Sequence, residues 1–223
     1  LDVAVQAVDR QVHATQPHGV GHPLLPVDAD AGLAAAPPAH KLGRLHEHAA
    51  RAAGGVEDVA VVGLDDLDDQ LDDGGGGEEL AAALPHLSWQ AADRAANLAG
   101  IRAWLDEAAL PNTPAPIAFD VSAAWPQQRF DAVFSANTLH IMSWSDVERL
   151  FAGLPGILTD DARLVIYTSE SNAVFNAWLK SQGAHQGLRD FEAVDALARQ
   201  AGLVLLEDRA MPSNNRCLVW RSA

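Results

Sequence analysis

The first 80 residues of this chain contain no Trp, Phe, Tyr, Ile, Ser or Asn, and all of its Met and Cys residues also come later. A segment without large apolar side chains buries too little area to offset its conformational entropy, about 1–2 kcal/mol per residue. Three interpretations remain open: a disordered acidic arm, a degenerate half of a domain, or sequence foreign to the fold. We therefore expect residues 1–55 to be an atypical acidic, His-rich, low-complexity segment, and residues 56–223 to form the domain.

Other absences limit the class of protein. A single cysteine excludes a disulfide framework and is typical of a reducing compartment. No apolar run approaches the roughly 20 residues of a membrane span, and the N-terminus lacks the basic and apolar regions of a signal peptide. A net charge of −15 argues against non-specific binding to nucleic acid. We expect a cytoplasmic protein with neither a membrane nor a nucleic-acid partner, and the oligomeric state stays open.

The acidic and histidine residues of the first 80 positions do not predict a metal site. These positions contain 15 acidic and 4 basic residues, which give −11 of the net charge. The Asp-rich run at 65–73 lacks the alternating acids and the closing Glu of a calcium loop. The histidines are interrupted by prolines and have no cysteine or aromatic residue near them, so we expect no metal at His13, His18, His22, His40, His46 and His48.

After residue 86, strand and helix patterns alternate. Strands are predicted at 87–91, 116–120, 131–135, 163–167, 203–206 and 217–220. Helices are predicted at 94–109, 145–154, 170–180 and 190–201, the third of these four segments starting with Ser145 and its capping box in second place along the chain. A turn is expected at 159–161. This alternation predicts an α/β fold with a doubly wound, mostly parallel sheet, and the last two strands are expected to form an antiparallel hairpin.

Asp93 and Asp120 each follow a predicted strand, and the strand at 131–135 continues into Ala136-Asn137-Thr138-Leu139-His140. An open α/β sheet binds its ligand beyond the carboxyl ends of its strands. This pattern resembles class I S-adenosylmethionine-dependent methyltransferases. From about Ala81 onward the chain is similar to a methyltransferase-like family whose substrate is not established. The other matching segments are Leu84–Gln90, Ile101–Leu105, Phe119–Val121, Ser171–Ala173, Arg189-Asp190 and Met211–Asn215.

The resemblance implies a seven-stranded, Rossmann-like methyltransferase sheet, S-adenosylmethionine as the cofactor, and methyl transfer to a small-molecule acceptor. It implies that Asp93 accepts hydrogen bonds from the ribose hydroxyls, and that Asp120 and Val121 flank the adenine. Asn137 would contact the cofactor near the sulfonium, and His140 would be a general base.

Each of these residues also has a plain structural interpretation. Asp93 could be the N-cap of a helix starting near Arg94, and Asp120 could be a solvated loop acid. His140 could be a buried histidine that braces its loop. The sequence leaves these alternatives open.

The N-terminal half departs from the family, whose members carry an acid and a glycine-rich turn about 15 residues before Leu84. Here the nearest glycines, Gly74–Gly77, follow an Asp-rich run and have the composition of a flexible linker. A second departure is that Tyr167 continues directly into Thr168-Ser169 without the loop that flanks the substrate mouth in this family. The alternative function is therefore a catalytically inactive methyltransferase fold that serves as a binding module.

The segments after Ala81 supply every strand of such a sheet except the first, central one. Without it, the strands at 87–91 and 131–135 would leave buried backbone groups unpaired, at about 1–3 kcal/mol per group. The only compact apolar run available lies around Val59–Val62. We therefore predict residues 58–63 as the central strand, which would place Gly63 and Asp65 where the glycine turn and its acid belong.

Overall fold

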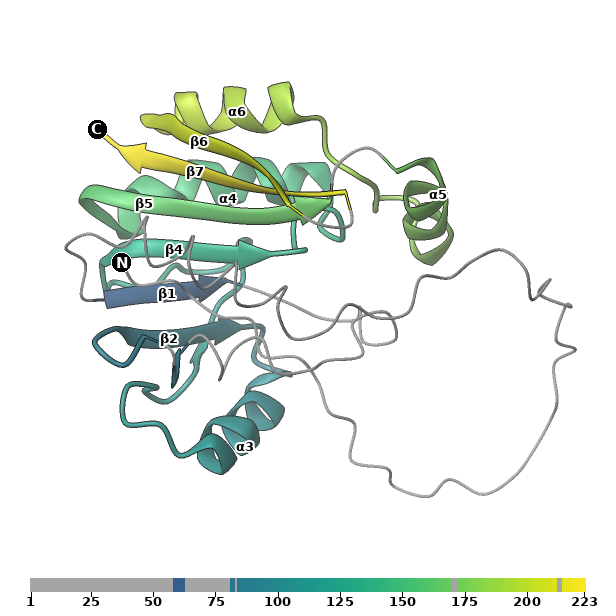
Figure 1. Cartoon of the computed structure of the whole chain (residues 1–223). Helices are drawn as coiled ribbons and strands as arrows, with labels where there is room; N and C mark the ends of the chain where they lie inside the picture. Colours follow the sequence, from purple (N-terminus) through teal and green to yellow (C-terminus); the bar gives the residue numbers. More distant parts are fainter. Residues whose placement is uncertain (1–57, 63–80, 83, 170–171, 212–213) are drawn as a thin grey trace, which may run out of the picture.

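The structure is a computed structural model that describes residues 58–62, 81–82, 84–169, 172–211 and 214–223 (Figure 1). The predicted segment 1–55 and the residues Gly63, Asp65 and Gly74–Gly77 lie outside the described residues. The strands are β1 (Asp58–Val62), β2 (Ser88–Asp93), β3 (Ile117–Ala118), β4 (Phe130–Ala136), β5 (Leu158–Ser169), β6 (Leu203–Met211) and β7 (Asn215–Ser222). The helices are α3 (Leu98–Ala108), α4 (Trp144–Ile157), α5 (Ala173–Gln182) and α6 (Phe191–Gln200).

The strands lie in the order β3-β2-β1-β4-β5-β7-β6. β1 pairs in parallel with β2 on one side and with β4 on the other: Val59 is opposite Trp89 in β2 and opposite Ala132 in β4. The predicted central strand is therefore confirmed. β7 pairs antiparallel with both β5 and β6, which confirms the C-terminal hairpin. The mixed α/β architecture predicted from the alternation is also confirmed.

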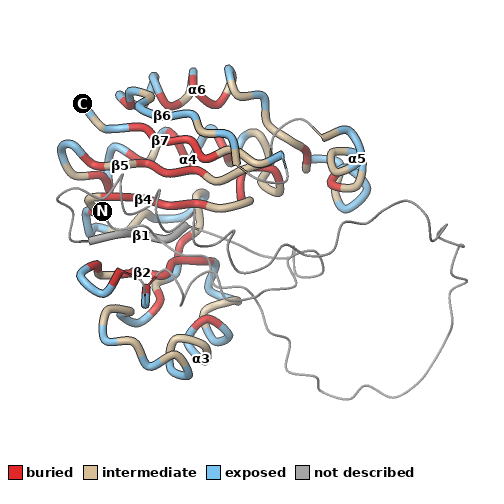
Figure 2. Tube along the Cα trace, viewed as in Figure 1, coloured by how far each residue is buried: buried red, intermediate tan, exposed pale blue. Residues whose placement is uncertain are grey.

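Alternate residues of β4 point into different cores, as the two-residue period of a strand requires. Val133 packs in a cluster with residues of α4 and α6, whereas Ala132 and Phe134 pack in a second cluster with Ile101 of α3. α3 therefore lies on the opposite face of the sheet from α4 and α6. Figure 2 shows the consequence, because the middle strands of the sheet are buried along most of their length.

Two helices begin at positions that differ from the prediction. α4 is capped by Ser143 rather than by Ser145, because the Ser143 hydroxyl accepts a hydrogen bond of 3.2 Å from the backbone N–H of Asp146. Both serines are followed three residues later by an acid, so the pattern alone could not distinguish them. α3 begins at Leu98 with Asn97 at its N-cap, four residues later than predicted.

The expected turn at 159–161 lies inside β5, which begins at Leu158. Asp161 has a left-handed φ of 63°, and the pairing with β4 shifts from Phe130–Leu158 to Ala132–Arg163. The extra residues of β5 form an irregularity at the amino end of the strand, far along the strand from its carboxyl end.

Candidate functional site

The predicted site residues of the described part gather at one edge of the sheet. β1, β2, β3 and β4 are mutually parallel, so their carboxyl ends lie at the same edge (Figure 1). Asp93 is the last residue of β2, Asp120 follows β3 by two positions, and Asn137 directly follows β4. The sheet thus brings together side chains that are up to 44 positions apart in the sequence.

Asp93 is an almost fully buried carboxylate, with 8% of its surface exposed. Its Oδ1 accepts a hydrogen bond of 2.6 Å from the backbone N–H of Arg94, and its backbone carbonyl accepts one of 2.7 Å from Phe119. Because Asn97 is the N-cap of α3, the helix-capping interpretation of Asp93 is wrong. A carboxylate has about four lone-pair positions, so Asp93 has acceptor capacity beyond the bond from Arg94.

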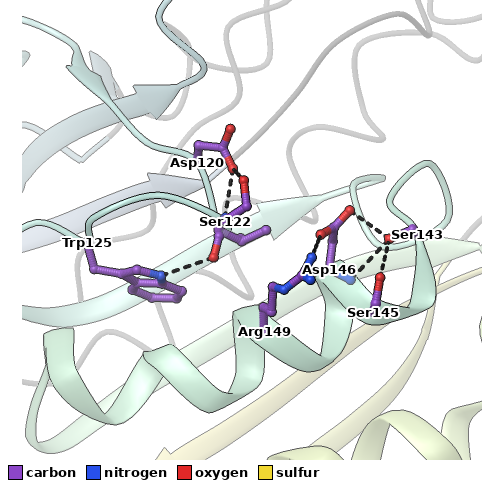
Figure 3. Close-up of polar contacts among 8 residues, drawn as sticks. Asp120, Ser122, Trp125, Ser143, Ser145, Asp146 and Arg149 are labelled. Atoms are coloured by element: carbon purple, nitrogen blue, oxygen red, sulfur yellow. Dashed lines mark hydrogen bonds and ion pairs between the residues drawn. The ribbon is translucent and has the colours of Figure 1, made fainter.

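Asp120 lies in the loop after β3 and organises that loop through one oxygen. Its Oδ1 accepts hydrogen bonds from the hydroxyl of Ser122 at 2.6 Å and from the backbone N–H of Ser122 at 2.8 Å. These two bonds lower the pKa of Asp120, and the positive charges of Arg94 and Arg149 act in the same direction. Figure 3 shows the other carboxylate oxygen directed away from Ser122.

Val121 packs against the core from the same loop. Its carbonyl accepts a hydrogen bond of 3.4 Å from the indole N–H of Trp125. The Trp125 ring in turn meets Phe119 edge to face, with centroids 4.9 Å apart. The loop that carries Asp120 and Val121 is thus anchored on both sides of these two residues.

The start of α4 lies beside this loop (Figure 3). Asp146 accepts a hydrogen bond of 2.7 Å from the Ser143 hydroxyl and forms an ion pair of 2.6 Å with Arg149. The hydrogen bond from Ser143 is the main cause that lowers the pKa of Asp146, whereas the negative charge of Asp120 opposes it. Asp120 and Asp146 therefore lie within electrostatic reach of each other, with Arg149 acting on both.

Asn137 turns the chain at the end of β4. Its φ is 56°, in the left-handed region that Asn tolerates better than most residues, and its N–H donates a bond of 2.8 Å to the carbonyl of Tyr167 in β5. The hydroxyls of Ser135 and Thr138 lie 2.5 Å apart just below this turn. The turn directs the following residues, including His140, back over the edge of the sheet.

His140 is fully buried, and within the described structure neither of its ring nitrogens has a hydrogen-bond partner. The ring of Phe175 in α5 meets it edge to face, with centroids 5.3 Å apart. Burial, and secondarily the positive charge of Arg189, lowers the pKa of His140 to about 4. The imidazole is therefore neutral at physiological pH and has no contact with solvent.

Arg189 contributes an anchor that sequence reasoning did not identify, although Arg189-Asp190 was among the matching segments. Its Nε donates a bond of 2.8 Å to the carbonyl of Leu139, and its Nη2 donates to the carbonyls of Met142 and His185. The backbone N–H of Gly187 adds a bond of 2.8 Å to the carbonyl of His140. These bonds join the loop after β4 to the segment after α5.

The described part of the chain shows neither a metal centre nor a membrane span. Among its residues, no group of three or more His, Cys, Asp or Glu side chains is placed to bind a metal ion. None of the helices that the structure describes is both long enough and apolar enough to cross a bilayer.

Comparison with protein families identifies the chain. Residues 73–222 match the family described as "Protein of unknown function (DUF938)", and this match covers about two thirds of the sequence. The chain belongs to the DUF938 family. The description of that family gives neither an activity nor a substrate.

Solved structures similar to this DUF938 protein are methyltransferases by their descriptions. An O-methyltransferase family protein from Burkholderia thailandensis matches with a TM-score of 0.62 and 14% identity, over 81% of this chain and 56% of that one. The mitomycin 7-O-methyltransferase MmcR matches with 0.65 and 17%, over 82% and 54%. PigF, solved with SAH, matches with 0.60 and 14%, over 82% and 57%.

At these identities the likeness shows the fold alone, and the DUF938 chain spans little more than half the length of these three structures. The methyltransferase fold that the sequence resemblance implied is therefore confirmed.

Proposed function

We propose that this DUF938 protein is an S-adenosylmethionine-dependent methyltransferase that acts on a small-molecule acceptor. The observation that carries the proposal is the buried carboxylate of Asp93 at the carboxyl end of β2, adjacent to the central strand β1. A buried carboxylate requires hydrogen-bond donors, and a pair of ribose hydroxyls supplies two of them. Similar folds include an S-adenosylmethionine-dependent methyltransferase, SibL, and PigF with SAH.

The residues beside Asp93 suit the remainder of the cofactor. The Asp120 oxygen that Ser122 does not occupy is an acceptor for the exocyclic amine of adenine, and Val121 supplies an apolar contact for the ring. Asn137, at the end of β4, would lie near the sulfonium. Gly63 and Asp65 remain proposals for the turn after β1, because they lie outside the described residues.

We assign His140 a bracing role rather than that of a general base. A base must reach the proton that it removes, and the His140 ring is fully buried behind Phe175. When S-adenosylmethionine is bound, its sulfonium supplies an electrophile that is already activated, so the protein contributes mainly positioning and exclusion of water.

Isothermal titration of the purified chain with S-adenosylhomocysteine tests the proposal. Saturable binding of one ligand per chain is expected. A chain that is folded by circular dichroism but takes up no S-adenosylhomocysteine would contradict the proposal. That result would favour the alternative, a methyltransferase fold that acts as a binding module, for which the atypical sequence at the expected glycine turn is the supporting observation.

A further inference from the structure

Arg189 differs from most arginines of the described structure because it has no acidic partner. Five other arginines form ion pairs with carboxylates: Arg149, Arg199, Arg209, Arg216 and Arg221. Among the described residues, no carboxylate lies within ion-pair distance of Arg189, whose bonds from Nε and Nη2 all go to backbone carbonyls. Its Nη1 makes no hydrogen bond within this part of the chain. A half-buried guanidinium thus retains one open donor group and its full charge.

The neighbouring His140 cannot supply a compensating negative charge. Its imidazole is fully buried, with both nitrogens unbonded in the described structure, and the loop that carries it is the one that Arg189 binds through Leu139 and Met142. A protonated His140 would add a second positive charge beside Arg189 without solvent to screen it. The surroundings of the loop therefore favour an anion and disfavour a protonated base.

We propose that the open face of Arg189 binds the anionic group of a methyl acceptor that reaches the site already ionised, such as a carboxylate, an acidic phenolate or a thiolate. This inference rests on the proposed methyltransferase function and adds the chemical class of the acceptor. A guanidinium is suited to this task because it is permanently charged and presents paired N–H donors to planar anions.

Charge and atoms balance without a base. The anionic oxygen or sulfur of the acceptor forms a bond to the methyl carbon while the bond between that carbon and the sulfonium sulfur breaks. The negative charge of the acceptor and the positive charge of the sulfonium cancel, and no proton is transferred. An acceptor of this kind explains why a site with a buried, neutral His140 needs no other proton acceptor.

The rings of Phe175 and Trp178 in α5 make a planar aromatic anion a reasonable probe. They are stacked with centroids 5.7 Å apart, and Phe175 lies against His140. Benzoate and benzamide have nearly the same shape and differ in charge. Titration of each into the chain saturated with S-adenosylhomocysteine compares the anion with its neutral isostere.

We expect benzoate to bind at least about tenfold more tightly than benzamide, which is the scale of one charge-assisted hydrogen bond. Arg189→Met should abolish the preference, and Arg189→Lys should retain it. Arg129→Met is the matched control, because Arg129 also donates to a backbone carbonyl, that of Leu158, but at the opposite edge of the sheet. This control should leave the preference unchanged.

A measurement on the unaltered chain covers the case in which Arg189→Met does not fold. The Nε–H resonance of Arg189 should shift on addition of benzoate and not on addition of benzamide. Equal binding of the two probes, no binding of benzoate, a resonance insensitive to benzoate, or a preference that survives in folded Arg189→Met would each overturn the inference. The titration with S-adenosylhomocysteine alone tests the proposed function separately.

Discussion

Gly153 in α4 lies directly against the ring of Trp125, and a Cβ atom added at Gly153 would come within 2.2 Å of ring carbon Cζ2. The absence of a side chain on the helix is therefore what allows Trp125 to occupy its position. Because Trp125 contacts Phe119 and donates to the carbonyl of Val121, Gly153 fixes the loop of the candidate adenine site from behind.

Gly153→Ala is therefore expected to destabilise the protein, although Ala is the better helix former. Overpacking of this kind costs about 1–3 kcal/mol, which exceeds the gain of roughly 1 kcal/mol from replacing Gly by Ala in a helix. Displacement of Trp125 should also weaken binding of S-adenosylhomocysteine through Val121. Urea denaturation and isothermal titration measure the two effects.

Gly156→Ala is the matched control in the same helix, since a Cβ at Gly156 meets nothing within 4 Å. This variant should be as stable as the unaltered chain or slightly more stable, with unchanged ligand affinity. Equal free energies of unfolding for the two variants would show that Trp125 moves aside at no cost.

The lowered pKa of His140 predicts a loss of stability in mild acid. The folded-state pKa is about 4, against an ordinary value of 6.5, so between these values the unfolded chain binds a proton that the folded chain does not. The stabilisation is fully present above pH 6.5 and is lost as the pH falls toward 4. A shift of this size corresponds to about 3 kcal/mol.

The measurement is the free energy of unfolding in urea at several pH values from 7 to about 4. His140→Phe, which keeps a ring beside Phe175 and removes the titrating group, serves as the reference. The difference between the two proteins isolates the histidine from the carboxylates. A difference that does not change with pH would show that His140 is solvated in the folded protein.

Asp93→Ala should weaken binding of S-adenosylhomocysteine by about 1.5–3 kcal/mol, the range for hydrogen bonds to a charged group. The reason is the loss of the buried acceptor at the end of β2, next to the central strand. Asp106→Ala, on an exposed position of α3, is the control and should leave the affinity unchanged. If Asp93→Ala folds and binds the ligand normally, Asp93 is not part of the site.

The arrangement of β1 and of the acids at the strand ends could be predicted from sequence because both follow from the sheet. A parallel sheet requires a strand between β2 and β4, and one compact apolar run was available to fill that position. The carboxyl ends of parallel strands then place Asp93 and Asp120 at one edge. No further information was needed for these two conclusions.

The roles of Arg189 and Gly153 could not be predicted in this way. Arg189 binds backbone carbonyls 47 and 50 positions earlier, and a carbonyl is present at every residue, so no sequence pattern marks its partners. Gly153 depends on how one indole ring packs on α4. Such contacts are decided by side-chain geometry, which the period of a helix or strand does not specify.

The indole N–H of Trp220, which is fully buried in β7, donates a hydrogen bond of 2.9 Å to the carboxylate of Asp195 in α6. Asp195→Ala would leave this donor without its acceptor, at a cost of about 1–3 kcal/mol. The ion pair of Asp195 with Arg199 adds little, because the Arg199 side chain is 71% exposed. Asp195→Asn retains an acceptor oxygen and should cost less than Asp195→Ala in urea denaturation.

A double-mutant cycle with Trp220→Phe tests whether the bond itself is responsible. Phe lacks the N–H, so Asp195→Ala should destabilise the Trp220→Phe background less than the unaltered chain, with a coupling of about 0.5–3 kcal/mol. Arg199→Ala, which removes only the exposed partner of Asp195, should change stability by less than about 1 kcal/mol. Strictly additive losses in the cycle would mean that Asp195 stabilises α6 through contacts other than its bond to Trp220.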